Sequence, residues 1–112
     1  MTVPREYLTD FELMLLLAIL RVGEGAYGVP IAREIEAFGE RTVLLGAVYK
    51  GLDRLEANGL ISSSVGSPTP ERGGRAKRYF RVTSSGMKAA RQAKRAFTRL
   101  WSGVPGLEGG RT

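Results

Sequence analysis

The sequence predicts an α+β fold that is mainly α-helical and contains one small β-hairpin. Three stretches in the first half repeat apolar residues every three to four positions, which is the period of an α-helix. Residues 60–65 and 77–82 have the composition of two β-strands, and a fourth helical stretch follows them. At 112 residues the chain fits one domain.

The first predicted helix begins with Thr9-Asp10-Phe11-Glu12, which has the pattern of a capping box. In this motif the threonine hydroxyl and the glutamate carboxylate each satisfy a free backbone amide. The helix should run to about Val22 and end at Gly23-Glu24-Gly25. It is apolar on nearly all sides, so more than one neighbour must bury it, and a partner subunit is one such neighbour.

The second and third helices should span 28–38 and 45–58. The apolar stripe of the second consists of Ile31, Ile35 and Phe38, and that of the third consists of Leu45, Val48, Leu52 and Leu55. The opposite face of the third helix is small near its start and basic further on, and it carries Gly46, Ala47, Lys50 and Arg54. Asn58-Gly59 is a common stop at a helix C-terminus.

Between the two predicted strands lies a long loop, 66–76, rich in proline, glycine and arginine. Three helices followed by strand, basic loop and strand are the order of a winged helix-turn-helix, whose third helix enters the DNA major groove. The loop, called the wing, lies along the DNA backbone or minor groove. We therefore expect a DNA-binding domain at 1–82, a dimerisation helix at 83–104 and a flexible tail at 105–112.

The charge distribution points to a polyanionic partner. The formal net charge is +6, and the stretch from Arg72 to Arg99 holds ten Lys and Arg residues and no acid. Nucleic acid is the first candidate partner and an anionic membrane the second. The alternative is a solvated basic face without a partner.

The composition argues against an enzyme. The chain has no cysteine and no histidine, which excludes disulfides and thiolate metal sites and removes the commonest general base and metal ligand. We expect no catalytic residue, no cofactor and no bound metal. The apolar run 13–20 is too short to span a bilayer and follows two acids, so we expect no membrane partner and a cytoplasmic location.

Three segments carry a resemblance to a known family. They are Gly46-Ala47-Val48-Tyr49, the run 52–60 (LDRLEANGL) and the run 77–86 (KRYFRVTSSG). With them, roughly residues 8–101 resemble the PadR-like transcriptional regulators, in particular the short branch with a single C-terminal helix. The resemblance implies a homodimeric repressor whose third helix and wing bind a pseudo-palindromic operator in double-stranded DNA.

The predicted DNA-binding residues lie around the third helix and on the wing. They are Thr42, Gly46, Ala47, Tyr49, Lys50, Arg54, Arg72, Arg75, Lys77 and Arg78. The small residues at the start of the helix permit close approach, and the cations supply phosphate or base-edge contacts. The resemblance implies DNA contacts for Tyr49 and Lys77. For Arg54 it leaves a second interpretation, in which the arginine braces the fold through an acid such as Glu56 or Glu12.

The chain departs from the family at the start of the third helix. Leu44 stands where the family usually has Ser or Thr, a hydroxyl that would cap the helix and could reach a phosphate. Thr42 or a bare backbone amide must substitute for it. Lys50 and Gly51 also stand where polar, uncharged residues are common, so the operator sequence that is read should differ.

The fourth helix is the predicted dimer interface. Its apolar stripe includes Met87, Ala90, Phe97, Leu100 and Trp101. The alternative is a helix that packs only on its own domain. Some short members of the family bind flat hydrophobic compounds between the subunits through aromatic residues of this helix. Phe97 and Trp101 are therefore candidate ligand contacts for a small hydrophobic effector, although simple interface anchors are the more common role.

Two other functions remain open from the sequence. A winged helix can serve as a protein–protein adaptor without specific DNA binding, in which case the basic helix would meet an acidic partner. An RNA-associated protein is disfavoured, because no exposed aromatic cluster for base stacking is evident. An adaptor has no need of cations on both the third helix and the wing, so the sequence favours the DNA-binding regulator.

Overall fold

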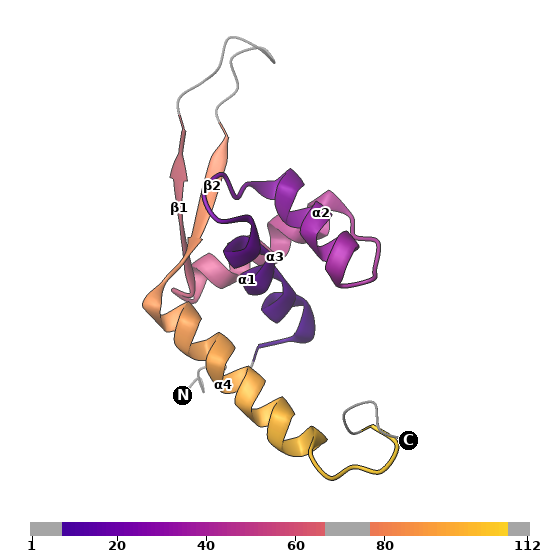
Figure 1. The fold of residues 1–112 in the computed structure, drawn as a ribbon. Helices are drawn as coiled ribbons and strands as arrows, with labels where there is room; N and C mark the ends of the chain where they lie inside the picture. The colour runs from indigo at the N-terminus through magenta and orange to yellow at the C-terminus, as the bar shows by residue number, and fades with distance from the viewer. Residues whose placement is uncertain (1–7, 67–76, 108–112) are drawn as a thin grey trace.

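The computed structural model describes residues 8–66 and 77–107. Its elements are α1 (Asp10–Val22), α2 (Gly28–Phe38), α3 (Leu45–Ala57), β1 (Ile61–Val65), β2 (Arg78–Val82) and α4 (Ser84–Trp101). The first three helices gather into one body, the hairpin rises beside them, and α4 extends away from the body (Figure 1). This order confirms the predicted helices and hairpin.

The N-terminus of α1 has the predicted capping box. The Glu12 amide donates to the Thr9 hydroxyl at 3.1 Å, and the Thr9 amide donates to the Glu12 carboxylate at 3.0 Å. The helix ends at Gly23, whose φ of 76° lies in the region that favours glycine. The local sequence therefore determines both ends of α1.

The core lies between α1, α2, α3 and the inner side of the hairpin. Its fully buried large side chains include Leu15, Leu16, Ile31, Leu52, Leu55 and Ile61. The predicted stripe of α2 was wrong at its last position, because Phe38 is exposed. The guanidinium carbon of Arg21 lies 3.7 Å from the centroid of the Phe38 ring, so this ring packs against a cation at the surface.

The start of α3 also differs from the prediction. Val48, Leu52 and Leu55 are buried as expected, whereas Leu45 remains 41% exposed. Leu44 is the N-cap residue and no side chain caps the helix, so a bare backbone end replaces the hydroxyl cap. Core packing of α3 therefore begins one turn further along, at Val48.

The two strands pair in antiparallel register, with Ile61 opposite Val82 and Ser63 opposite Phe80. On the other edge of β2, the Phe80 amide donates to the Ala26 carbonyl at 2.8 Å. The rings of Tyr27 and Tyr79 meet edge to face, with centroids 5.8 Å apart. The hairpin is thus tied to the segment that leads into α2.

The start of α4 docks on the turn between α3 and β1. Thr83 caps the helix by accepting from the Gly86 amide at 3.1 Å, and its hydroxyl donates to the Gly59 carbonyl at 2.7 Å. Gly86 is buried, and a Cβ atom there would overlap the Leu60 carbonyl oxygen. The docking therefore requires a glycine.

The helix α4 ends at Trp101, and turns follow it to residue 107. The Trp101 indole donates to the Leu107 carbonyl at 2.8 Å, so this segment folds back on the tryptophan. Residues 108–112 of the predicted tail lie outside the described residues.

Candidate nucleic-acid interface

The outward face of α3 is open at its start. Gly46 and Ala47 are exposed, and a Cβ atom built on Gly46 would meet no other atom within 4 Å. Lys50 follows one turn later, also exposed, and Thr42 is exposed just before the helix. A bulky surface such as a DNA groove can therefore approach the N-terminal turn of α3 without a steric barrier.

Tyr49 is half-buried, and its ring lies against the first residue of α2. A Cβ atom at Gly28 would overlap this ring, so the glycine provides the space that the tyrosine occupies. The side chain is held by α2 and presents only part of its surface outward. This contact was not predicted from the sequence, in which the signal for it is a glycine at the first position of a helix.

Arg54 takes the bracing position that was its second interpretation. Its Nε lies 3.7 Å from Oε2 of Glu12, a carboxylate that is only 2% exposed. A buried carboxylate is costly unless it is paired and hydrogen-bonded, so Arg54 helps to make Glu12 tolerable in the interior. The Arg54 side chain is itself 54% exposed, and part of it still faces outward.

Arg78 is held by three side chains of α3 and β1. Its Nη1 donates to Asp53 at 3.2 Å, its Nε donates to the Ser63 hydroxyl at 3.2 Å, and its Nη2 donates to Glu56. The Ser63 hydroxyl in turn donates to Glu56 at 2.7 Å. These contacts fix the base of the wing to α3, which gives Arg78 a positioning role that its prediction as a DNA contact did not include.

These contacts also shift the protonation equilibria. The hydrogen bond from Ser63 and the neighbouring Arg78 hold the pKa of Glu56 below its ordinary value, against the opposing effect of burial. Burial lowers the pKa of Arg78, but its bonds to Glu56 and Asp53 outweigh this and raise the pKa. Both shifts favour the charged forms of Glu56 and Arg78 at neutral pH, and the two acids and one arginine give the cluster a formal net charge of −1.

The acids Asp53 and Glu56 were missed as partners of Arg78. The available signal was their spacing of three residues, which places both on one side of α3.

With Arg54 and Arg78 paired to acids, Lys50 is the cation of α3 that makes no ion pair with another described residue. It is the strongest candidate on this helix for a contact with DNA.

Only the base of the wing belongs to the described part of the chain. Lys77 is half-buried, and its Nζ lies 4.9 Å from the centroid of the Tyr27 ring. Arg72 and Arg75, the other predicted wing contacts, lie outside the described residues.

The predicted dimer stripe of α4 divides into two halves. Met87 and Ala90 are half-buried, and Ala90 packs against the core of its own domain. Phe97, Leu100 and Trp101 are 55%, 74% and 53% exposed. The unsatisfied apolar surface of α4 is therefore its C-terminal half.

A shallow hollow of about 350 Å³ on this half is lined by Phe97, Thr98, Trp101 and Ser102. It brings together the two side chains predicted as ligand contacts.

On α1, Leu17 and Leu20 are also exposed, as expected for a helix that is apolar on nearly all sides.

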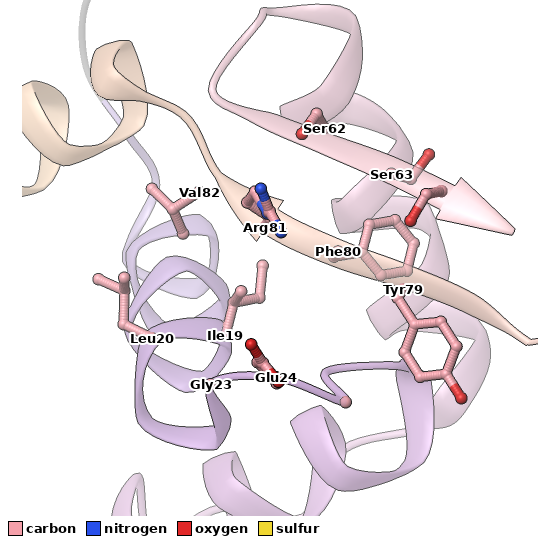
Figure 2. Close-up of a pocket in the computed structure, with 12 residues that line it drawn as sticks. Ile19, Leu20, Gly23, Glu24, Ser62, Ser63, Tyr79, Phe80, Arg81 and Val82 are labelled. Atoms are coloured by element: carbon pink, nitrogen blue, oxygen red, sulfur yellow. The ribbon is translucent and has the colours of Figure 1, made fainter. Parts of the chain in front are cut away.

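A larger hollow of about 690 Å³ lies between the C-terminal end of α1 and the hairpin. Figure 2 shows Arg81 of β2 and Glu24 of the turn after α1 on its two sides. No residue of α3 lines it, so it is separate from the open face of that helix.

Within 8–66 and 77–107, no three His, Cys, Asp or Glu side chains are grouped so that they could hold a metal ion. No helix in the same ranges is long and apolar enough to cross a membrane.

Comparison with protein families gives a match to the transcriptional regulator PadR-like family over residues 16–92. The chain belongs to the PadR-like family of transcriptional regulators. The matched range runs from the middle of α1 to the middle of α4, so it includes α3 and both strands of the wing. PadR regulators bind DNA, and the face of α3 described above is therefore a candidate DNA-binding surface.

Solved structures agree with this assignment. The complex structure of hsRosR-S1 is similar with a TM-score of 0.64 and 26% identity, covering 87% of this chain and 79% of that chain. The PadR family regulator of Eggerthella lenta DSM 2243 has a TM-score of 0.63 and 23% identity, covering 78% of this chain and 73% of that one. A PadR family regulator of Clostridium difficile R20291 has a TM-score of 0.62 and 24% identity, covering 81% and 91%.

These neighbours confirm the winged-helix α+β fold. Among curated protein sequences, no significant match to this chain is found.

Proposed function

We propose that this PadR-like protein is a sequence-specific repressor that binds a pseudo-palindromic operator in double-stranded DNA as a homodimer. The observation that carries the proposal is the open N-terminal turn of α3, Gly46 and Ala47, followed by the exposed Lys50, which forms no ion pair with any other residue that the structure describes. In helix-turn-helix proteins the N-terminal residues of the recognition helix contact base edges in the major groove. Each monomer has one such helix, so a pseudo-palindromic operator requires two copies.

The exposed half of α4 supports pairing of two copies. Phe97, Leu100 and Trp101 together form an apolar surface that soluble monomers rarely leave open. To bind half-sites one helical turn of DNA apart, the two α3 helices of the dimer must lie about 34 Å apart. The exposed leucines of α1, Leu17 and Leu20, are available to enlarge the interface.

The remaining predicted contacts divide by role. Arg72, Arg75 and Lys77 of the wing contact phosphates, which positions the protein without reading sequence. Lys50 reaches a base edge. Arg54 and Arg78 act mainly by holding α3 and the base of the wing in place, since each is paired with an acid.

We further propose that a planar hydrophobic compound binds between the subunits as an effector. The hollow beside Phe97 and Trp101 supports this, because it would be covered by the second subunit in the proposed dimer.

A regulator of this kind acts where the chromosome lies, which we propose is the cytoplasm.

The first experiment is a salt titration of binding to an operator selected from random duplexes. A dimer that neutralises roughly 6–10 phosphates should lose affinity steeply and linearly on a log–log plot of affinity against salt concentration. A scrambled duplex of the same length is the control, and it should bind more weakly at every salt concentration. A flat response to salt, or equal affinity for both duplexes, would contradict a sequence-specific repressor.

The second experiment separates the wing from α3. Replacing Arg75 and Lys77 together with alanine should weaken binding to all duplexes by a similar factor, because wing contacts are mainly to the backbone. Lys50→Ala should also change the preferred sequence. If the wing variant binds every duplex as well as the unchanged protein does, the wing does not lie on DNA.

A further inference from the structure

The N-terminal end of α3 carries two exposed leucines. Leu44, the N-cap residue, is 77% exposed, and Leu45, the first helical residue, is 41% exposed. Helical periodicity predicted Leu45 in the core, yet the core contact of α3 starts only at Val48. These two side chains therefore extend from the same end of the helix that holds the open glycine and alanine.

The neighbouring residues make the two leucines prominent. Gly46 has no side chain and Ala47 has only a methyl group, and both are exposed. No side chain caps the helix, so the free backbone amides of the first turn are the polar groups that this end itself supplies. A DNA groove that reaches the open end of α3 would therefore meet the exposed side chains of Leu44 and Leu45.

The major groove offers one apolar group to such side chains, the C5 methyl of thymine. Apart from C–H groups such as C5–H of cytosine, the other groups on the base edges there are hydrogen-bond donors or acceptors, which a leucine cannot satisfy and would desolvate at a cost. We propose that Leu44 and Leu45 read thymine methyl groups, so that each operator half-site has thymine where the end of α3 meets the groove. This inference rests on the proposed function, because it requires α3 to enter the major groove.

The test replaces thymines of the selected operator with deoxyuridine, one position of the half-site at a time. Deoxyuridine lacks only the methyl group and keeps the base pair, the phosphate charge and the other groove contacts. At one or two positions per half-site, affinity should fall roughly fourfold for each methyl group removed from contact with leucine. At the remaining positions it should not change.

The same duplexes are then measured with Leu44→Ala and, as the matched control, with Lys50→Ala. Leu44→Ala should weaken binding to the thymine operator, and at the position that Leu44 contacts it should bring the thymine and uracil duplexes to nearly equal affinity. Lys50→Ala should weaken both duplexes and leave the fourfold ratio unchanged. Because Leu44 is mostly exposed, its replacement should leave the thermal unfolding temperature unchanged, which separates lost recognition from lost folding.

The outcomes distinguish this inference from the function on which it rests. If binding is specific but uracil is tolerated at every position, the methyl contact is wrong and the repressor proposal stands. If Leu44→Ala weakens thymine and uracil duplexes by the same factor, the leucine contacts sugar or phosphate and the inference also fails. If no duplex is preferred over its scrambled control, the proposed function itself is wrong.

Discussion

The buried Gly86 should be among the positions of the chain least tolerant of substitution. In Gly86→Ala the new methyl group would overlap the Leu60 carbonyl oxygen, which belongs to the backbone and cannot rotate away. That carbonyl also accepts from the Thr83 amide at 3.0 Å, so relief of the overlap would weaken the bond that docks α4 on the domain.

The expected magnitude combines three effects. Alanine favours helix by about 1 kcal/mol relative to glycine. Overpacking costs typically about 1–3 kcal/mol, and the loss of a hydrogen bond about 0.5–1.5 kcal/mol. The net destabilisation should be about 1–3 kcal/mol. For domains of roughly this size it lowers the unfolding temperature by about 4–8 °C per kcal/mol.

The assay is thermal unfolding followed by circular dichroism, with Ser85→Ala as the matched control. Ser85 is the exposed neighbour of Gly86 in the same helical turn, so its replacement should stay within about 0.5 kcal/mol of the unchanged protein. If Gly86→Ala unfolds within about 2 °C of the control, the close contact between α4 and the turn before β1 does not exist as described.

Three further predictions concern assembly, the effector and pH. Phe97→Asp should give a monomer in sedimentation at micromolar concentration, since an unpaired carboxylate is costly in a buried interface, and a persistent dimer would move the interface elsewhere. A planar hydrophobic compound bound between subunits should quench Trp101 fluorescence and shift operator affinity, whereas quenching alone would mean a pocket without a switch. Because the pKa of Glu56 is lowered in the folded chain, its stabilising effect is present above the ordinary value of 4.5 and is lost as pH falls further. The difference in unfolding temperature between the protein and Glu56→Gln should therefore shrink below about pH 4.5, and a constant difference would exclude this linkage.

The local sequence predicted those features that local physics determines. The capping box of α1 follows from backbone needs that a few neighbouring residues satisfy, and each strand begins one residue later than predicted and ends where predicted. Periodicity placed Val48, Leu52 and Leu55 in the core correctly. It was wrong for Leu45 and Phe38. The repeat of apolar residues continues to the end of a helix even where no neighbouring element packs against that end.

The contacts between distant segments could not be predicted in the same way. Arg78 lies in β2 and was interpreted as a DNA contact, since a cation in a basic run gives no sign of its own acid partners. Asp53 and Glu56 become its partners only when the hairpin folds back beside α3. Gly28 and Gly86 are similar cases, because the atoms that a side chain would strike there belong to Tyr49 and Leu60.

The pairing of the arginines changes how DNA binding should be understood. The sequence places four cations on α3 and at the base of the wing, but two of them, Arg54 and Arg78, both face acids. The cluster of Asp53, Glu56 and Arg78 carries one net negative charge, which opposes close approach of phosphates to the last turn of α3. Under the proposed function, phosphate contacts should then come mainly from the cations of the wing. In that function Lys50 and the apolar end of α3 read bases, so the contacts that provide affinity and those that provide specificity lie largely on different elements.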